Sequence, residues 1–180
     1  MFVQIEKTPN PNSLKFLPGK KVSLKGSFEV SNKDQSDNEL VRNLLSINGV
    51  TSIFLGYDFL SVNKKNNINW EELEHIIKSF INEYYSNGNE IVIDTIKEKK
   101  IDHNLEEIEK KIIKILDTKI RPAVAKDGGD IKFQEFKNGI VKVKLQGSCS
   151  GCPSSTMTLK QGVQNLLCHY IPEVKEVLAI

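Results

Sequence analysis

Two kinds of hydrophobic pattern divide the first 86 residues into short strands and longer helices. Apolar and polar positions alternate in five short segments, which is typical of strands with one buried face. Two longer segments repeat apolar residues every three or four positions, as an amphipathic helix does. The predicted strands are 2–7, 13–17, 27–30, 50–55 and 59–64, and the predicted helices are 37–47 and 70–85. This order predicts a small α+β domain over residues 1–86, with a strand-rich layer and two helices.

The turns and caps of this domain have recognisable sequences. Residues 8–12 read TPNPN, and the two prolines fix φ, so this segment is predicted to be a rigid turn between the first two strands. Gly56-Tyr57-Asp58 predicts a hairpin between the last two strands. Ser36 or Asp37 is the predicted N-cap of the first helix. Trp70, at the start of the second helix, is expected to fix that helix to the domain.

Residues 87–103 interrupt this organisation and are predicted to be a linker. The segment begins within the Ser-Asn-Gly-Asn sequence at residues 86–89 and then becomes charged without a clear period. Its one apolar cluster is Ile91-Val92-Ile93, which could pack against a domain or a partner.

A second domain is predicted over residues 104–180. Apolar residues with helical spacing predict a first helix at 105–121, capped by Asn104 and followed by a kink at Pro122. Asp127-Gly128-Gly129-Asp130 predicts a turn. Two alternating strands, 131–136 and 140–145, are joined at Lys137-Asn138-Gly139, which indicates a hairpin. A helix at 153–170 and a strand at 174–180 complete the order α-β-β-α-β, with a cysteine loop before the second helix.

The cysteine loop contains the main candidate for a functional site in this chain. It contains Cys149 and Cys152, separated by Ser150 and Gly151 and followed by Pro153. Two thiols at this spacing can hold a metal or close a disulfide. Proline suits the first position of a helix, so both thiols are expected to lie at a helix N-terminus. The partial positive charge of that terminus favours the thiolate, which is the form that binds metals or attacks disulfides.

Composition excludes several functional classes. There are 25 Lys and Arg residues and 23 Asp and Glu residues, and this balance gives no reason to expect binding to nucleic acid or to a membrane surface. No apolar run reaches the roughly 18–20 residues that a membrane span needs. Three cysteines, of which two form a close pair, favour a reducing compartment over a disulfide scaffold. The bacterial cytoplasm and the mitochondrial matrix both fit. The absence of a targeting segment favours the cytoplasm unless the chain is a processed form.

The remaining candidate ligands are weaker. Cys168 follows an apolar stripe near the end of the last helix, so we expect a partly buried thiol rather than a ligand. His75 and His169 are expected to be exposed helix residues, and His103 falls at the end of the linker. Asp127 and Asp130 could tune a site at the cysteines, although a turn explains the sequence more simply.

Several segments of the second domain form a specific set when they are taken together. They are RPA at 121–123, DGGD at 127–130, LQGSCSGCPSSTMTL at 145–159 and PEV at 172–174. On these residues the second domain resembles the C-terminal domain of the NifU family. Residues 8–12, 14–16 and 50–59 resemble the N-terminal domain of the family's Nfu members, so the resemblance covers nearly the whole chain.

The resemblance implies a non-enzymatic iron–sulfur cluster carrier. Such a protein receives a cluster from a donor scaffold and passes it to apo-proteins. The family further implies a cluster held between the two subunits of a homodimer by Cys149 and Cys152 of each chain. The cluster is usually [4Fe–4S], with [2Fe–2S] as the alternative. The residues agree, since such clusters generally take four thiolates and one chain offers two in position.

Two other functions stay open at the level of sequence. One is a thiol–disulfide oxidoreductase that uses Cys149 and Cys152, because a CxxC pair at a helix N-terminus after a strand also occurs in thioredoxin-like sites. The other is a structural zinc site that bridges a dimer, because zinc accepts four thiolates in tetrahedral geometry. Metal and sulfide content would separate the three functions.

Overall fold

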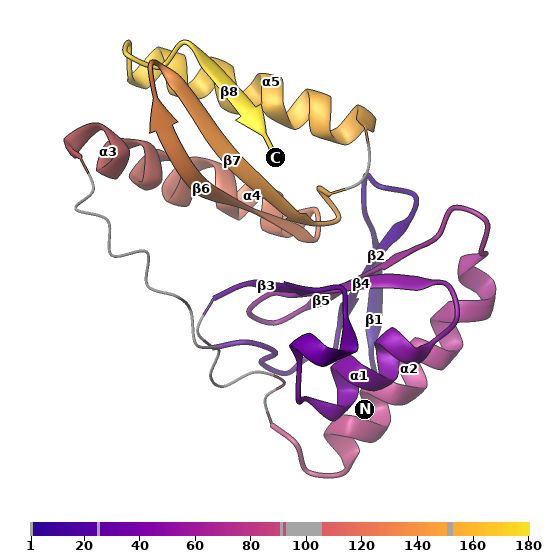
Figure 1. The fold of residues 1–180 in the computed structure, drawn as a ribbon. Helices are drawn as coiled ribbons and strands as arrows, with labels where there is room; N and C mark the ends of the chain where they lie inside the picture. The colour runs from indigo at the N-terminus through magenta and orange to yellow at the C-terminus, as the bar shows by residue number, and fades with distance from the viewer. Residues whose placement is uncertain (1, 25, 91, 93–105, 151–152) are drawn as a thin grey trace.

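A computed structural model of the chain describes residues 2–24, 26–90, 92, 106–150 and 153–180. Two groups of elements, each with its own sheet and helices, are arranged one above the other in Figure 1. The α+β class expected from the sequence is confirmed. Within the described residues, no helix has an apolar stretch long enough to cross a membrane.

A five-stranded antiparallel sheet forms the framework of the N-terminal group. Its strands are β1 (Gln4–Lys7), β2 (Ser13–Leu17), β3 (Phe28–Val30), β4 (Val50–Leu55) and β5 (Leu60–Lys64). They lie in the order β1-β2-β5-β4-β3. All five predicted strands are present, and the first begins at Gln4 rather than Phe2.

Two helices, α1 (Glu39–Ser46) and α2 (Trp70–Ser86), belong to this group (Figure 1). Their apolar side chains contribute to its core. The Asn38 side chain caps α1 by accepting a hydrogen bond from the Val41 N–H at 3.2 Å. The predicted caps, Ser36 and Asp37, are therefore wrong, and the polar loop before the helix contains a short 3₁₀ turn at Lys33–Gln35. Val92, which the sequence placed in the linker, is buried in the same core.

The other face of the sheet is largely buried and carries mostly polar residues, which surround the buried side chain of Phe54. Because side chains alternate along a strand, strands that place leucine, valine and phenylalanine in the core turn polar residues to the opposite side. We call this set the polar face, and it comprises Lys15, Glu29, Ser52, Ser61 and Asn63. Glu29 is partly buried and the other four are buried. Such alternation usually indicates a solvated face, but here β7 of the C-terminal domain lies against β3, β4 and β5.

The C-terminal domain follows the predicted order. Its elements are α3 (Glu107–Ile115), α4 (Arg121–Lys126), β6 (Gly129–Lys137), β7 (Ile140–Gly147), α5 (Pro153–Tyr170) and β8 (Glu176–Ala179). The β6–β7 hairpin turns at Asn138 and Gly139, which both have positive φ, as the sequence predicted. The last strand, β8, pairs with β7 in parallel. A separate apolar core lies inside this domain.

The predicted kink at Pro122 is present. A π-helical segment, Leu116–Ile120, joins α3 to α4, and Pro122 lies in the first turn of α4. Proline lacks the N–H that would continue the α-helical ladder, and its ring crowds the carbonyl four residues earlier. The helix therefore re-forms after a widened turn. The predicted cap Asn104 lies outside the described residues, and Glu106 occupies the N-cap position of α3.

Candidate metal centre

Cys149 lies in the loop that joins the end of β7, at Gly147, to the start of α5, at Pro153. The predicted partner, Cys152, lies outside the described residues. The side chain of Cys149 is 7% exposed. Thr156, in the first turn of α5, donates from its hydroxyl to the carbonyl of Cys149 at 3.3 Å, which ties the helix start to the loop. Cys149 is thus carried by a strand-to-helix turn, as the sequence predicted.

Hydrogen bonds fold this loop back on the turn before β6. The Ser148 N–H donates to the Gly128 carbonyl at 3.2 Å, and the Ser148 hydroxyl donates to the Asp127 carbonyl. The Ser150 N–H and hydroxyl both donate to the Gly147 carbonyl, at 3.1 and 2.8 Å. The Ser148 hydroxyl also lies 3.9 Å from the Cys149 sulfur. These bonds hold the backbone on both sides of Cys149.

Two glycines are required by the close approach of this loop to β6. A Cβ at Gly129 would lie 2.6 Å from the Cys149 sulfur and 2.6 Å from the Gln146 carbonyl oxygen. Gly147 has a φ of +68°, and a Cβ there would lie 2.6 Å from the Gly128 carbonyl oxygen. The glycines therefore let two backbone segments and a thiol meet without a side chain between them.

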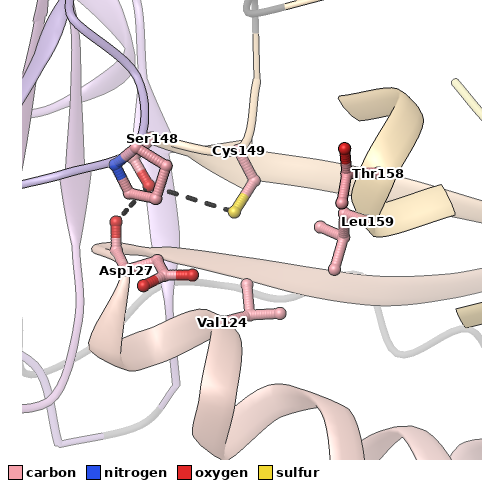
Figure 2. Close-up of a pocket in the computed structure, with 7 residues that line it drawn as sticks. Val124, Asp127, Ser148, Cys149, Thr158 and Leu159 are labelled. Atoms are coloured by element: carbon pink, nitrogen blue, oxygen red, sulfur yellow. Dashed lines mark hydrogen bonds between the residues drawn. The ribbon is translucent and has the colours of Figure 1, made fainter. Parts of the chain in front are cut away.

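The Cys149 sulfur lines a cleft of about 350 Å³. Figure 2 shows the sulfur pointing into the space between Asp127, Val124 and Leu159. Pro9 of the N-terminal domain also lines this cleft. Among the described residues, the wall combines apolar side chains with the Cys149 thiol, the Asp127 carboxylate and two hydroxyl residues. The sulfur is the strongest ligand for a soft metal among these side chains.

Burial raises the pKa of the Cys149 thiol to about 11. The hydrogen bond with Ser148 acts in the opposite direction, and the Asp127 and Asp130 carboxylates make smaller contributions to the increase. The expectation that the helix terminus favours the thiolate is therefore wrong for Cys149 in this arrangement. Removal of the sulfur from water is the larger effect, because it penalises the charged form directly. The thiol is protonated at neutral pH and must lose its proton when a metal binds.

Asp130 proves to have a structural role. Its side chain is buried and accepts hydrogen bonds from Arg121 Nε at 2.8 Å and Nη2 at 2.9 Å. The hydroxyl of Ser27, in the N-terminal domain, donates to the same carboxylate. The ion pair raises the pKa of the Arg121 guanidinium. Asp127 and Gly128 form the predicted turn, and Asp130 joins the two domains beside it.

The other candidate ligands are not gathered at the cleft. Cys168 packs partly buried against the C-terminal core, as expected. It lies 15 residues after Pro153 in α5, roughly 22 Å along the helix axis. His75 and His169 are exposed, as expected, and His103 lies outside the described residues. Over the described part of the chain, no three His, Cys, Asp or Glu side chains come together as a metal site.

Sequence reasoning missed the contribution of the N-terminal domain. The Asn10 side-chain amide donates to the carbonyls of Ser148 and Ser150, at 3.0 and 3.2 Å. Asn63 donates to the Gly147 carbonyl at 3.1 Å, and the Ser61 hydroxyl donates to the Gly128 carbonyl at 2.6 Å. The one sequence feature that could have indicated this contribution was the polar residues at alternate positions of the predicted strands.

Comparison with known proteins identifies the family. Residues 3–88 match the model of the "Scaffold protein Nfu/NifU N terminal" domain, and residues 112–178 match the model of the NifU-like domain. The chain belongs to the NifU/Nfu family. The resemblance drawn from the sequence motifs is thereby confirmed.

Two relatives that match almost the whole chain are mitochondrial proteins by name. NifU-like protein 4 of Arabidopsis thaliana is 42% identical over 98% of this chain, and the chain spans 65% of that protein. The human NFU1 iron-sulfur cluster scaffold homolog is 43% identical over 98% of this chain, which spans 71% of it. The solution structure of a NifU-like protein from Saccharomyces cerevisiae has a TM-score of 0.48 at 27% identity. It covers 53% of this chain and 87% of its own.

Proposed function

We propose that this protein is an iron–sulfur cluster carrier. It would hold a [4Fe–4S] cluster between two copies of the chain through Cys149 and Cys152 of each, and pass it to apo-proteins. The supporting observation is that the Cys149 sulfur lines a cleft on a strand-to-helix turn, in a chain whose relatives are named as iron–sulfur cluster scaffolds. The cluster is cargo in this proposal, so the protein acts as a carrier rather than an enzyme.

The number of thiols supports sharing between chains. Iron–sulfur clusters generally take four thiolates, and the chain contains three cysteines. Cys168 lies about four helical turns from the loop and packs against the C-terminal core, so it cannot reach the same cluster. Each chain therefore supplies two ligands, and a second copy is needed to complete the set.

The raised pKa of the buried Cys149 thiol weighs against Cys149 as the attacking thiol of the redox alternative. Thiols that catalyse disulfide exchange have a lowered pKa, since the thiolate is the attacking form. Burial instead raises the pKa of Cys149 to about 11. A cluster carrier tolerates this value because iron displaces the proton when it binds. The mitochondrial relatives favour the mitochondrial option over a bacterial cytoplasm.

Anaerobic reconstitution with iron and sulfide tests the proposal. We expect about four iron and four sulfide per two chains, together with a shift from monomer to dimer on size-exclusion chromatography. Cys149→Ser and Cys152→Ser should each abolish the cluster and the cluster-dependent dimer, because each removes two of the four ligands of the shared site. Cys168→Ser is the matched control and should retain both.

Three outcomes would contradict the proposal. Full cluster occupancy in Cys149→Ser would remove that residue from the ligand set. Zinc without iron or sulfide would indicate the structural dimer, because zinc also accepts four thiolates. A metal-free protein in which the two loop cysteines cycle through an intramolecular disulfide would indicate the oxidoreductase.

A further inference from the structure

The side chain of Asn10 crosses the domain boundary and bonds to the residues on both sides of Cys149. Asn10 belongs to the TPNPN turn between β1 and β2, which lies beside the cysteine loop in Figure 1. Its single amide nitrogen donates to the carbonyl of Ser148, before the cysteine, and to that of Ser150, after it. An amide has two N–H donors, so it can make both bonds at once. The residue is 3% exposed.

The turn that presents Asn10 is itself held in place. The Thr8 hydroxyl donates to the Asn10 and Ser13 carbonyls, each at 2.9 Å. The Asn10 side-chain oxygen accepts from the Asn12 N–H at 2.9 Å, which orients the amide nitrogen toward the cysteine loop. The Trp70 indole donates to the Pro11 carbonyl at 2.9 Å. With φ fixed at both prolines, little freedom is left to the turn.

The polar face of the sheet extends the same contact. Asn63 donates to the Gly147 carbonyl and Ser61 to the Gly128 carbonyl, and the Ser150 hydroxyl donates to Glu29 Oε1 at 3.3 Å. Within residues 147–150 of the loop region, three residues therefore bond to the N-terminal domain through their backbone or side chain. They are Gly147, Ser148 and Ser150. Buried polar groups on a sheet need partners, and here the cysteine loop and the turn before β6 supply several of them.

We infer that Asn10 is a positioning residue for the cluster ligand Cys149, and that the N-terminal domain is a structural part of the cluster site. Asn10 fixes the two peptide groups that flank the cysteine and so holds the sulfur toward the cleft. Pro9, the neighbouring residue, lines the same cleft. The inference rests on the proposed function, because it concerns how the chain holds the ligand that the proposed function uses.

The test compares two asparagines of the same turn. Asn10→Ala removes both bonds to the cysteine loop. Asn12→Ala is the matched control, because the Asn12 side chain bonds to Asn66 and Lys64 within the N-terminal domain. Trp70 fluorescence during urea unfolding shows whether each variant keeps the N-terminal fold. Asn10→Asp is the second variant, since it keeps the shape but turns a carboxylate oxygen toward two carbonyls.

Two measurements report on the loop itself. In a Cys152→Ser, Cys168→Ser background, Cys149 is the only thiol, and its alkylation rate in the metal-free chain measures how often the loop opens. In the chain with both loop cysteines, loss of iron from the reconstituted protein to a chelator measures how firmly the cluster is held. Asn10→Ala and Asn10→Asp should raise both rates about tenfold, as expected for the loss of one or two hydrogen bonds. Asn12→Ala should change neither.

Three results would overturn the inference. Asn10 variants that fold and match the wild-type alkylation and iron-loss rates would show that the amide does not hold the loop. Equal effects in Asn12→Ala would assign the change to the turn as a whole. Tighter iron binding in the Asn10 variants would show that the domain contact opposes the cluster. If the wild-type chain takes up no iron, the proposed function fails, and the alkylation rates still decide whether Asn10 positions Cys149.

Discussion

At the scale of single residues, burial determines the chemistry of the site more strongly than sequence position. Cys149 follows a strand and precedes a helix start, which predicts a more acidic thiol. Its sulfur is nevertheless packed against the backbone of Gly129, and the loss of water raises its pKa. Glu29, on the polar face, shows the same effect. Burial raises its pKa, although hydrogen bonds from Ser52 and Ser150 act in the opposite direction.

Glu29 therefore predicts a specific pH dependence of stability. A carboxyl whose pKa is raised on folding destabilises the folded state while it is charged, and this penalty is relieved as pH falls through the folded pKa. Glu29→Gln removes the titration. The free energy of unfolding of the variant, minus that of the wild type, should therefore decrease as pH falls from 7 toward the unfolded value of 4.5. Urea unfolding at several pH values measures it.

Glu135 provides the control for that experiment. It lies on β6, bonds to Lys142 at 2.8 Å, and has a lowered pKa caused by that bond. The stability that the charged Glu135 gives to the folded state is present above pH 4.5 and is lost only below it. Glu135→Gln should therefore show a constant difference from the wild type between pH 7 and 5. A Glu29→Gln difference that is equally constant, or that grows as pH falls, would contradict the assignment.

At the scale of elements, glycine has opposite roles in a strand and in a helix. Gly129 begins β6 at the point where the cysteine loop crosses it, and the space for a Cβ is already filled by the Cys149 sulfur. Gly162 lies inside α5, and a Cβ there would meet no atom within 4 Å. The first glycine is required by packing, whereas the second only weakens its helix.

Alanine substitutions should separate these two roles. Gly129→Ala should destabilise the protein by about 1–3 kcal/mol, because overpacking shifts the loop or the strand. Gly162→Ala should stabilise it by about 0.5–1 kcal/mol, because alanine favours the helix. Urea unfolding with a shared m-value measures both changes. If Gly129→Ala were as stable as the wild type, the close approach of Cys149 to β6 would be wrong.

At the scale of the whole molecule, two apolar cores are joined by a mostly polar boundary, in which Phe54 lies close to Gly147. One core lies between the five-stranded sheet and its helices, and the other lies inside the C-terminal domain. The contacts between them include the Asn10, Ser61 and Asn63 bonds, the Ser27 bond to Asp130, and a bond from Lys132 Nζ to the Ser27 carbonyl at 2.8 Å. Polar boundaries of this kind allow domains to unfold separately.

Core substitutions should reveal two unfolding transitions. Phe16→Ala deletes a fully buried side chain of the first core and should destabilise the N-terminal domain by about 3–5 kcal/mol. Leu167→Ala, fully buried in the second core, is the matched change in the other domain. In calorimetry each should move mainly the transition of its own domain to lower temperature. A single transition shifted equally by both variants would show that the domains unfold as one unit.

Much of the fold could be predicted because local patterns determine it. Helix α5 has the bounds that the spacing of its apolar residues and Pro153 predicted, and the hairpins turn where glycine and asparagine permit positive φ. The start of α1 was misplaced because several adjacent polar residues could cap it, and Asn38 is the one whose oxygen reaches the Val41 N–H. The assignment of Cys149 and Cys152 as ligands remains a prediction, which the reconstitution experiment tests.

The sequence by itself determined the order of the strands and helices, the loop that carries the cysteine pair, and the family. These properties depend on short-range spacing and on motifs that a single segment contains. Only the tertiary structure decided the protonation of Cys149, the use of Asp130 as a link between domains, and the contact of Asn10 with the cysteine loop. Asn10 and Ser148 are 138 residues apart. Their hydrogen bond forms because two folded sheets meet, and no local pattern encodes which polar face another domain will cover.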